Sequence, residues 1–354
     1  MNKKALIAMS GGVDSSVAAY LTQQMGFNCA GATMQLCDRD LLGTEPGSDI
    51  QDAQNIAQRL GMEFHLLEAT SLFRQAVVDN FVSCYESGLT PNPCVQCNRF
   101  LKFGYLVEKA LALGCDHVVT GHYARIRKDP NTGRYLLLKA ADPTKDQSYF
   151  LAGLTQEQMS HILFPLGDLT KEEARSIAQA QGFINARKKD SQDICFIPDG
   201  DYAAFLRRYT GKTYPGGDFL DLKGNVVGKH SGAVDYTLGQ RKGLGLAMGA
   251  PVYVCSKNME NNTVTVGPNQ ALFATSLRAN DWSWFPFSHL SEPMRVTAKA
   301  RSRHSPQPAT VYPEENGFVR VDFDEPQRAL TPGQAIVLYD GDLVVGGGTI
   351  TEVL

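Results

Sequence analysis

The sequence lacks a long apolar segment, an excess of positive charge and a dense set of cysteines. The apolar run at residues 5–9 ends in Ser10-Gly11-Gly12, so we expect neither a signal peptide nor a membrane span. There are 34 Lys and Arg against 37 Asp and Glu, and the net charge of -3 excludes general attraction to nucleic acid. Such a partner would need a local basic patch. Eight cysteines in 354 residues are too few for a disulfide scaffold, so we expect a soluble, reduced, cytoplasmic protein.

The length exceeds what one hydrophobic core usually organises, which predicts two or three domains. With 43% hydrophobic and 20% charged residues, the composition is that of neither a disordered nor a fibrous protein. Glycine and short strands become more frequent from about residue 210. We therefore predict an N-terminal domain at residues 1–210, a small central domain at 211–275 and a C-terminal domain at 276–354.

Strand-like and helix-like runs alternate in the first half of the chain. Strands are predicted at residues 5–9, 29–36, 63–67 and 116–120, and helices at 15–25, 49–60, 72–85 and 100–113. A further helix is predicted at 171–181, with Thr170 as its cap and Glu173 as the capping-box partner. The alternation predicts an α/β fold, a doubly wound parallel sheet with helices on both faces and ligands at the carboxyl ends of its strands.

The second half has fewer helical patterns and more short strands. A turn at residues 130–133 separates two strand-like stretches, and further strands are predicted at 252–255, 263–266, 296–301, 318–323 and 335–338. Asp340-Gly341 lies between two apolar runs and predicts a tight hairpin. We expect the tail to form a small β-barrel, with a sandwich as the alternative.

Glycines and hydroxyl residues form the junction between the first strand and the first helix, in the order Ser10-Gly11-Gly12-Val13-Asp14-Ser15-Ser16. Adjacent glycines permit a tight turn with inward N–H groups, serine hydroxyls add donors, and the helix N-terminus adds a positive dipole. The pattern predicts a pyrophosphate cradle, with Asp14 as a candidate to hold the Mg²⁺ that accompanies ATP. Unlike the GxxxxGKS/T loop, the motif has no lysine for the terminal phosphates, which suits pyrophosphate release. The alternative is an ordinary glycine-rich turn capped by serine.

Three of the cysteines lie in polar surroundings. Cys94 and Cys97 form a C-x-x-C pair in a loop that opens a helix, and Cys195 follows the basic run at residues 187–189. The helix N-terminus, with Arg99 and Lys102, predicts a lowered pKa for Cys97. The basic run predicts the same for Cys195, provided that the fold brings the run close to it. The other five are interpreted as core residues, Cys37 being the most ambiguous: Cys29, Cys37, Cys84, Cys115 and Cys255.

Three kinds of chemistry fit the polar cysteines. A structural zinc site would need two more ligands, and the sequence has no second C-x-x-C and no H-x-x-x-H. Cys94, Cys97 and Cys195 could instead hold a 4Fe-4S cluster with an open coordination position. Alternatively, the thiols act directly, as sulfur carrier and nucleophile. Direct thiol chemistry is favoured, but composition does not separate the three hypotheses.

Separate blocks of the chain resemble a known family. Residues 10–15 resemble the motif of the N-type ATP pyrophosphatases. The chain closely resembles the bacterial tRNA-specific 2-thiouridylases essentially from end to end, in the blocks Asn92-Pro93-Cys94-Val95-Gln96-Cys97-Asn98, Thr120-Gly121-His122-Tyr123-Ala124, Lys145-Asp146-Gln147-Ser148-Tyr149-Phe150-Leu151, Asp190-Ser191-Gln192-Asp193-Ile194-Cys195-Phe196-Ile197, Tyr236-Thr237-Leu238-Gly239-Gln240-Arg241-Lys242-Gly243-Leu244-Gly245, Thr331-Pro332-Gly333-Gln334 and Gly346-Gly347-Gly348.

The resemblance implies an ATP-dependent transferase that makes 2-thiouridine at the wobble position of tRNA. ATP would adenylate the C2 oxygen of uridine with release of pyrophosphate, and a persulfide sulfur would then displace AMP. Cys97 matches the family's nucleophile and Cys195 the carrier of the persulfide. By the resemblance, Cys97 attacks the persulfide and either frees sulfide or closes a transient disulfide with Cys195. The resemblance also implies tRNAs for Lys, Glu and Gln, and a cysteine desulfurase or sulfur-relay protein as the sulfur donor.

The resemblance also assigns individual positions. ATP would be bound by Ala8, Met9, Ser10, Gly11, Gly12, Val13, Asp14, Ser15, Met34 and Gly121. The flipped-out target base would lie against Asn92, Pro93 and Cys94. The tRNA-contacting positions match His122, Lys145, Asp146, Gln147, Arg301, Ser302 and Gln334. Arg301, Arg303 and His304 form the expected local basic patch, with a charged, solvated strand edge as the alternative.

One departure from the family and two rival functions remain open. Some relatives have an acidic residue with a proton-transfer role where this chain has Cys94, which weakens that role here and favours the cluster hypothesis. The same loop could serve amidation, although the sequence shows no glutaminase domain and amidation would not need Cys97 and Cys195. It could also serve a non-enzymatic ATP sensor, which would show no tRNA-dependent pyrophosphate release.

Overall fold

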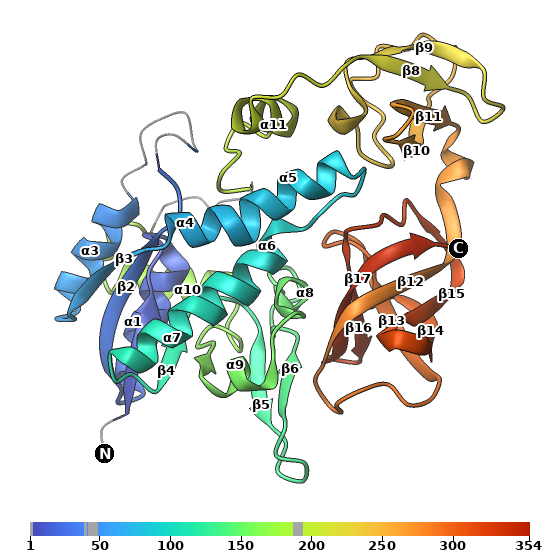
Figure 1. Cartoon of the computed structure of the whole chain (residues 1–354). Coiled ribbons are helices and arrows are strands. Elements are labelled where there is room, and N and C mark those ends of the chain that lie inside the picture. Colours follow the sequence, from blue (N-terminus) through green and yellow to red (C-terminus); the bar gives the residue numbers. More distant parts are fainter. Residues whose placement is uncertain (1–2, 39–40, 42–48, 187–193) are drawn as a thin grey trace.

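The computed structural model describes residues 3–38, 41, 49–186 and 194–354, which fold into three parts (Figure 1). An α/β part comes first, a small β part lies beside the end of α5 (Asp79–Glu86), and a barrel ends the chain. Within the described residues, no helix has the length and apolar character to cross a membrane. The predicted fold types are confirmed, while the boundaries near residues 210 and 275 stay a prediction.

The α/β part is built on a five-stranded sheet in the order β3-β2-β1-β4-β7, and every pair in it is parallel. Its strands are β1 (Lys4–Ala8), β2 (Asn28–Gln35), β3 (Phe64–Glu68), β4 (His117–Val119) and β7 (Ile162–Leu163). In the centre, Ile7 of β1 pairs with Gly31 of β2 and Val119 of β4. The carboxyl ends of these three strands therefore meet at one edge of the sheet.

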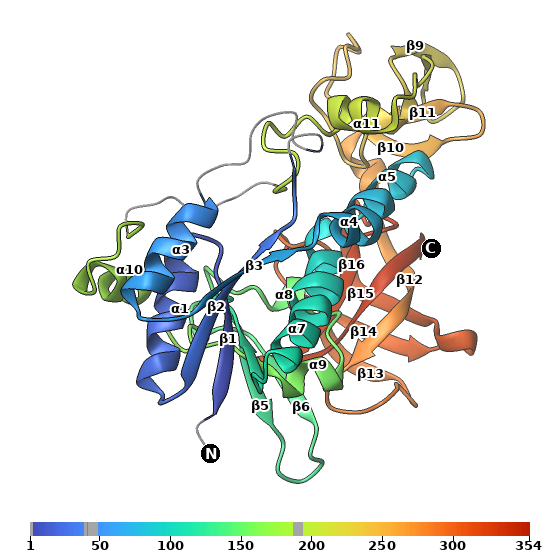
Figure 2. The same cartoon turned by 60° about the vertical axis from the view of Figure 1, so that its left-hand side comes forward.

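Helices cover both faces of this sheet (Figure 2). The helices α1 (Val13–Gln24), α3 (Asp49–Arg59) and α10 (Lys171–Ala180) pack on the face to which Ile7 points. On the other face, Leu6 packs with Leu106 and Ala110 of α7 (Leu106–Ala112). Neighbouring residues of a strand face opposite sides, so β1 is apolar from Ala5 to Ala8 because both sides are covered there. The predicted doubly wound arrangement is confirmed.

Two long helices contain π-helical segments. One runs through α4 (Thr70–Phe73), η1 (Arg74–Val78) and α5, and the other through α6 (Pro93–Gln96), η2 (Cys97–Tyr105) and α7. The second helix begins at Pro93, before the predicted start at residue 100, because proline suits the first turn of a helix. π-Helical turns are rare and occur often at functional sites, and this one begins at Cys97.

The central part is a four-stranded sheet in the order β10-β11-β8-β9. The strands β10 (Tyr253–Asn258) and β11 (Thr263–Gly267) agree with the sequence prediction, whereas β8 (Gly217–Leu220) and β9 (Val226–His230) were not predicted. In these two short strands Gly, Asp, Lys and His interrupt the few apolar residues, so the sequence shows no alternation of apolar and polar positions. Phe219, Val254 and Val264 nevertheless pack together as a buried core.

The last part is a closed barrel of six antiparallel strands. Its strands are β12 (Phe273–Trp284), β13 (Met294–Lys299), β14 (Gln307–Pro313), β15 (Val319–Arg328), β16 (Ala335–Asp340) and β17 (Leu343–Val353). Closure follows because β12 pairs with both β15 and β17. The predicted barrel and the hairpin at Asp340-Gly341 are confirmed. Closure leaves the barrel without exposed sheet edges.

The barrel is attached to the α/β part through β17. Leu343 of β17 pairs with Leu138 of β6 (Tyr135–Leu138), which forms a hairpin with β5 (Arg125–Lys128). A Cβ on Gly347 would lie 2.5 Å from the Cβ of Ala152, just after α8 (Ser148–Leu151). Glycine at this position therefore lets the two parts approach closely. Short elements that were not predicted include α9 (Gln156–Ser160), η3 (Ala233–Asp235), η4 (Asn269–Leu272) and η5 (Glu315–Gly317).

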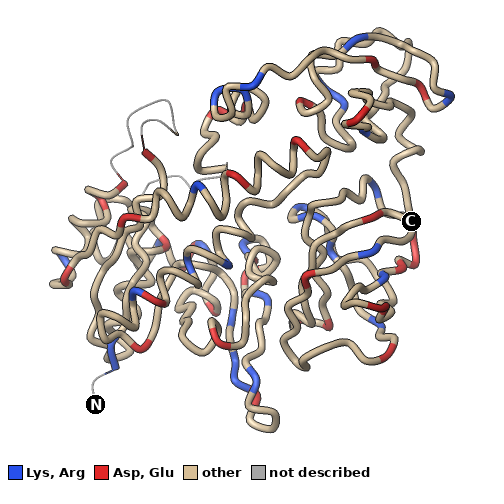
Figure 3. Tube along the Cα trace, in the orientation of Figure 1, with Lys and Arg blue, Asp and Glu red and all other residues tan. Residues whose placement is uncertain are grey.

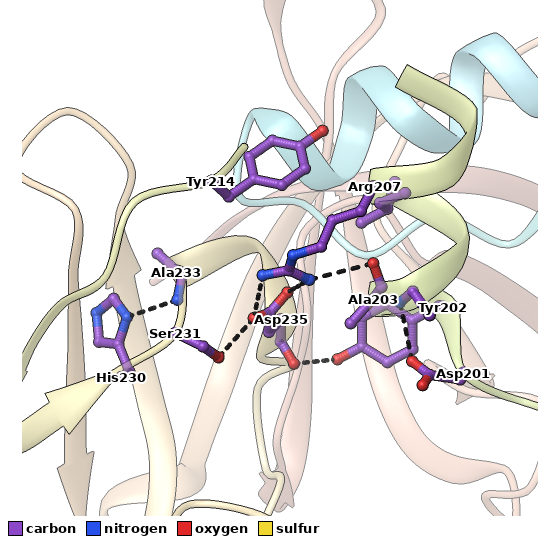
Figure 4. Close-up of polar contacts among 12 residues, drawn as sticks. Asp201, Tyr202, Ala203, Arg207, Tyr214, His230, Ser231, Ala233 and Asp235 are labelled. Atoms are coloured by element: carbon purple, nitrogen blue, oxygen red, sulfur yellow. Dashed lines mark hydrogen bonds and ion pairs between the residues drawn. The ribbon is translucent and has the colours of Figure 1, made fainter. Parts of the chain in front are cut away.

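An unpredicted helix, α11 (Tyr202–Thr210), holds the central part in place (Figure 4). Arg207 donates two hydrogen bonds to the carboxylate of Asp235, at 2.7 and 2.8 Å. The same carboxylate accepts a bond from Ser231 at 2.7 Å, and the Tyr202 hydroxyl donates to the backbone carbonyl of Asp235 at 2.6 Å. Because bidentate Arg–carboxylate pairs fix geometry as well as adding energy, this contact sets how α11 meets the central sheet.

We expect Asp235→Ala to lower the free energy of unfolding by about 1–3 kcal/mol, because it leaves a partly buried Arg207 unpaired. Denaturant unfolding measures this change. The control Asp324→Ala removes a pair of the same geometry with Arg295, at 2.7 and 2.8 Å, but there the side chains are 47% and 60% exposed. We expect no measurable loss in the control. Equal losses in both variants would contradict this assignment.

Candidate active site

The turn at Ser10, Gly11 and Gly12 joins β1 to α1 in a conformation that requires glycine. Gly11 has φ +70°, and a Cβ on it would lie 2.4 Å from the carbonyl oxygen of Asp49. Ser15 Oγ donates to the carbonyl of Gly12 at 3.0 Å and accepts from the backbone N–H of Ser10 at 3.2 Å. The loop is thus preorganised by its own serine, with the N-terminus of α1 beside it.

Two residues far away in the sequence complete the loop. The Nδ2 of buried Asn185 donates to the carbonyl of Gly11 at 3.0 Å and to Ser16 Oγ at 2.9 Å. Lys171 Nζ lies 2.8 Å from both carboxylate oxygens of Asp14. Sequence analysis missed both residues, and no local pattern could have revealed them, because each contact spans more than 150 positions.

Gly121 brings the loop after β4 against the first turn of α1. A Cβ on Gly121 would lie 2.7 Å from the carbonyl carbon of Asp14 and 2.8 Å from the N atom of Ser15. On the β2 side of the loop, the hydroxyl of Thr33 donates to the carbonyl of Met9 at 2.6 Å. Thr33 directly precedes Met34, so this bond fixes the backbone next to Met34. The structure therefore brings the predicted ATP positions to one edge of the sheet, while their roles in ATP binding stay a prediction.

Four thiols gather near this edge. Cys37 follows β2, Cys94 and Cys97 lie at the junction of α6 and η2, and Cys195 lies in a turn. Cys37 and Cys195 hydrogen-bond each other, and Cys195 acts electrostatically on both Cys94 and Cys97. Cys37 also packs against the buried cluster that contains Cys97. The interpretation of Cys37 as a core residue is therefore incomplete, because it contacts a predicted reactive thiol.

The expectation of a lowered pKa for Cys97 is wrong. Burial raises the pKa of this thiol to about 12, and the opposing effect of Lys102 is smaller. Cys195 as a residue is exposed. The pKa of its thiol is nevertheless raised, first by its hydrogen bond with Cys37 and then by the protein atoms that surround the sulfur on its inner side, while that bond lowers the pKa of Cys37. The basic residues Arg187, Lys188 and Lys189, expected to activate Cys195, lie outside the described residues. In this conformation the proton of the pair therefore belongs to Cys195.

The cysteines do not form a metal site in the described part of the chain. There, no group of three His, Cys, Asp or Glu side chains is placed to hold a metal ion. Cys94, Cys97 and Cys195 thus do not fit the three-ligand arrangement that a 4Fe-4S cluster requires. All eight cysteines are free thiols. The cluster and zinc hypotheses receive no support from this arrangement.

Several predicted tRNA-contacting side chains make contacts within the protein. His122 is half-buried. The protein around its ring lowers its pKa well below the usual value by desolvation, and its Nδ1 lies 2.7 Å from Thr120 Oγ1. Asp146 accepts hydrogen bonds from Ala140 and Ser148, and Gln147 accepts one from the backbone N–H of Tyr123 at 2.9 Å. The Lys145 side chain is half-buried. These residues are therefore held in place before any RNA binds.

Gln334 links the barrel to the predicted base-binding segment. Its Nε2 donates to the carbonyls of Thr90 and Pro91, at 2.8 and 3.1 Å, just before Asn92. The N–H of Thr90 in turn donates to the carbonyl of Pro332 at 3.0 Å. The barrel therefore positions the chain that leads to Asn92, Pro93 and Cys94.

The basic patch differs from the prediction. Figure 3 shows Lys and Arg interspersed with Asp and Glu along most of the chain, and gathered along the β5–β6 hairpin. Burial and the neighbouring Arg301, Arg328 and Lys299 lower the pKa of His304, so this histidine adds no charge at neutral pH. Arg328 and Lys299 belong to the patch instead, since they lie close enough to act on the same ring.

Arg301 lies in the wall of an open cavity where the three parts meet. The cavity has a volume of about 600 Å³ and is lined by residues 199–203, 235, 237–240 and 301. Arg301 donates to the carbonyl of Leu238 and to Thr331 Oγ1, while its buried Nε has no partner among the described residues. Ser302 follows it in the same half-buried segment. This cavity is separate from the loop at residues 10–15.

The chain combines a parallel sheet and its glycine-rich loop with two β parts and four neighbouring thiols. This combination defines the class: α/β proteins with a glycine-rich loop at the carboxyl edge of a parallel sheet. Three family models match the chain: the tRNA methyl transferase HUP domain at residues 3–199, the tRNA methyl transferase PRC-barrel domain at 203–268 and the aminomethyltransferase beta-barrel domain at 274–350. Together they span the three parts of the fold.

Curated relatives extend over the whole chain. The tRNA-specific 2-thiouridylase MnmA of Clostridioides difficile is 47% identical over 359 residues, covering 100% of this chain and 99% of the relative. That of Acetivibrio thermocellus is 47% identical over 355 residues, covering 98% and 99%. The U34-tRNA thiolase NcsA of Methanococcus maripaludis, solved with its 4Fe-4S cluster, aligns with 59% of this chain and 67% of its own, at 18% identity and a TM-score of 0.35. The chain belongs to the family of tRNA-specific 2-thiouridylases and is an enzyme of the transferase class.

We expect the alkylation rate of Cys97 by iodoacetamide to keep rising with pH up to at least 10, because a pKa of about 12 leaves little thiolate below that value. Mass spectrometry after brief labelling of the tRNA-free protein at several pH values measures this rate. The same chain unfolded in urea is the control, in which the rate should level off above about pH 8.5. A plateau below pH 8 in the folded protein would contradict the raised pKa.

Proposed function

We propose that the chain is a tRNA-uridine 2-sulfurtransferase that activates the C2 oxygen of the wobble uridine with ATP and replaces it by sulfur from a persulfide. The observation that carries this proposal is the convergence of the loop at residues 10–15 and the thiols of Cys97 and Cys195 at one edge of the sheet. Family membership supports tRNA as the substrate, since the relatives are named tRNA-specific 2-thiouridylases.

In the first step, the loop binds ATP with Mg²⁺ and releases pyrophosphate. The backbone N–H groups around Gly11 and Gly12 and the N-terminus of α1 suit the β- and γ-phosphates. The uridine C2 oxygen attacks the α-phosphorus, and the bond to the β-phosphate oxygen breaks. Adenylation is needed because a carbonyl oxygen of uridine is a poor leaving group. The nucleoside would lie against Met34 and Gly121.

In the second step, sulfur enters through Cys195. Its exposure allows a cysteine desulfurase or a sulfur-relay protein to load it with a persulfide. The terminal sulfur attacks C2, and AMP leaves with the former uridine oxygen. The Cys97 thiolate then attacks the Sγ of Cys195, which frees 2-thiouridine and leaves a Cys97–Cys195 disulfide for a cellular thiol to reduce.

Burial of Cys97 requires a conformational change before this attack. A thiol with a pKa near 12 is almost fully protonated at neutral pH, and the two sulfur atoms must reach disulfide distance. We propose that docking of tRNA moves the segments that carry Cys97 and Cys195. The protein around the sulfur of Cys94 raises the pKa of this thiol by desolvation, although the residue keeps an exposed surface, so at neutral pH it is a proton donor and not a base.

The tRNA would contact all three parts of the chain, divided at residues 1–210, 211–275 and 276–354. The target base would be flipped out against Asn92, Pro93 and Cys94. The proposed tRNA contacts are His122, Lys145, Asp146, Gln147, Arg301, Ser302 and Gln334. The buried Nε of Arg301, which has no partner within the described residues, suits an incoming phosphate. We propose tRNAs for Lys, Glu and Gln as substrates.

We expect Cys97→Ser and Cys195→Ser each to lower 2-thiouridine formation by at least about 100-fold, because each removes a sulfur that the reaction needs. Nucleosides are analysed by mass spectrometry after incubation of unmodified tRNA with ATP, Mg²⁺ and a persulfide donor. tRNA-dependent pyrophosphate release should persist in both variants. Cys255→Ser, in the central sheet, is the control and should keep full activity. Full thiolation by both active-site variants would refute the proposal.

A further inference from the structure

Lys171 is a buried cation in direct contact with the nucleotide loop. Its Nζ lies 2.8 Å from both carboxylate oxygens of Asp14, and its side chain is only 9% exposed. The hydroxyl of Tyr123 donates to Oδ1 of the same carboxylate at 2.9 Å, and the Lys171 ammonium lies 5.7 Å from the centre of the Tyr123 ring. The carboxylate in the loop is thus surrounded by donors before nucleotide binds.

The backbone of Lys171 is fixed, whereas its long side chain can direct the ammonium to different partners. Lys171 is the first residue of α10, whose N-terminus is closed by a capping box between Thr170 and Glu173. Its own N–H donates to Asp142 Oδ2 at 3.1 Å. The ammonium lies at the end of a flexible four-carbon stem, so it can change partners without movement of the helix.

The charge balance of the loop suggests that such a change occurs. The motif at residues 10–16 contains no lysine, and Asp14 adds a negative charge where ATP phosphates would bind. Mg²⁺ prefers carboxylate and phosphate oxygens, so Mg²⁺ that arrives with ATP competes with the ammonium for Asp14. The displaced ammonium then lies next to the phosphates, to which a charge-assisted hydrogen bond is strong.

We propose that Lys171 is the phosphate-binding lysine of this loop: it holds Asp14 in the nucleotide-free chain and moves to the β- or γ-phosphate when Mg²⁺ takes the carboxylate. This inference rests on the proposed function only in requiring that the loop binds ATP. A lysine 157 positions away would then supply what other phosphate loops carry within their own motif.

Equilibrium binding of ATP and of AMP, each with Mg²⁺, tests this role. We expect Lys171→Met to weaken ATP binding by about 10- to 100-fold, the effect of losing one or two charge-assisted hydrogen bonds, and to leave AMP binding within about twofold. Lys171→Arg should recover part of the loss. Lys4→Met, an exposed lysine of the same domain, is the control and should bind as wild type.

A double variant separates this role from simple neutralisation of Asp14. If Lys171 only neutralises the carboxylate, Asp14→Asn/Lys171→Met regains the ATP affinity of Asp14→Asn alone, and the inference is wrong. If Lys171 binds phosphate, the double variant stays about 10- to 100-fold weaker than Asp14→Asn. The double variant contains no unpaired carboxylate, so it also covers the case in which Lys171→Met fails to fold. Wild-type protein that binds no ATP would refute the proposed function, whereas equal binding by wild type and Lys171→Met would refute this inference alone.

Discussion

The parallel pairing of β1 with β2 and β4 is the constraint on which the rest of the site depends. It places the carboxyl ends of three strands side by side, so that the loop at residues 10–12, Cys37 and Gly121 begin at one edge. Close contact then requires glycine at Gly11 and Gly121, where a Cβ would overlap backbone atoms. The helices on both faces hold this sheet rigid, and the barrel fixes the proposed base-binding segment through Gln334.

Burial and hydrogen bonding, more than nearby cations, set the state of the thiols in this conformation. Burial keeps Cys97 protonated, and Cys195 shares its hydrogen with Cys37. A protonated thiol is a poor nucleophile, so the thiols are unreactive in this conformation and the proposed reaction requires a conformational change that alters their surroundings. The same reasoning applies to the loop, where Lys171 pairs with Asp14 at the proposed site for Mg²⁺ and ATP. In this conformation, the groups proposed for sulfur transfer are protonated thiols, and the carboxylate proposed for Mg²⁺ is paired with a lysine.

Much of the fold was predictable because its signals are local. The strand and helix periods, the turn at Asp340-Gly341 and the capping box of Thr170 with Glu173 each need only a few neighbouring residues. The missed features depend on tertiary contacts. Lys171 reaches the loop from the start of α10 and Asn185 from a turn after that helix, and β8 and β9 are too short and polar to give a pattern. The prediction of a lowered pKa for Cys97 was wrong because it considered only the helix N-terminus and nearby cations. It omitted burial, which only the folded chain reveals.

The central claim is that the uridine oxygen itself is activated by ATP and leaves with AMP. Unmodified tRNA that carries ¹⁸O at C2 of the wobble uridine tests this most directly, in a single turnover with ATP, Mg²⁺ and a persulfide donor. The account predicts that the heavy isotope is found in the phosphate of AMP, in an amount equal to the 2-thiouridine formed. Recovery of 2-thiouridine with the isotope in water, in pyrophosphate or in any product other than AMP would contradict it.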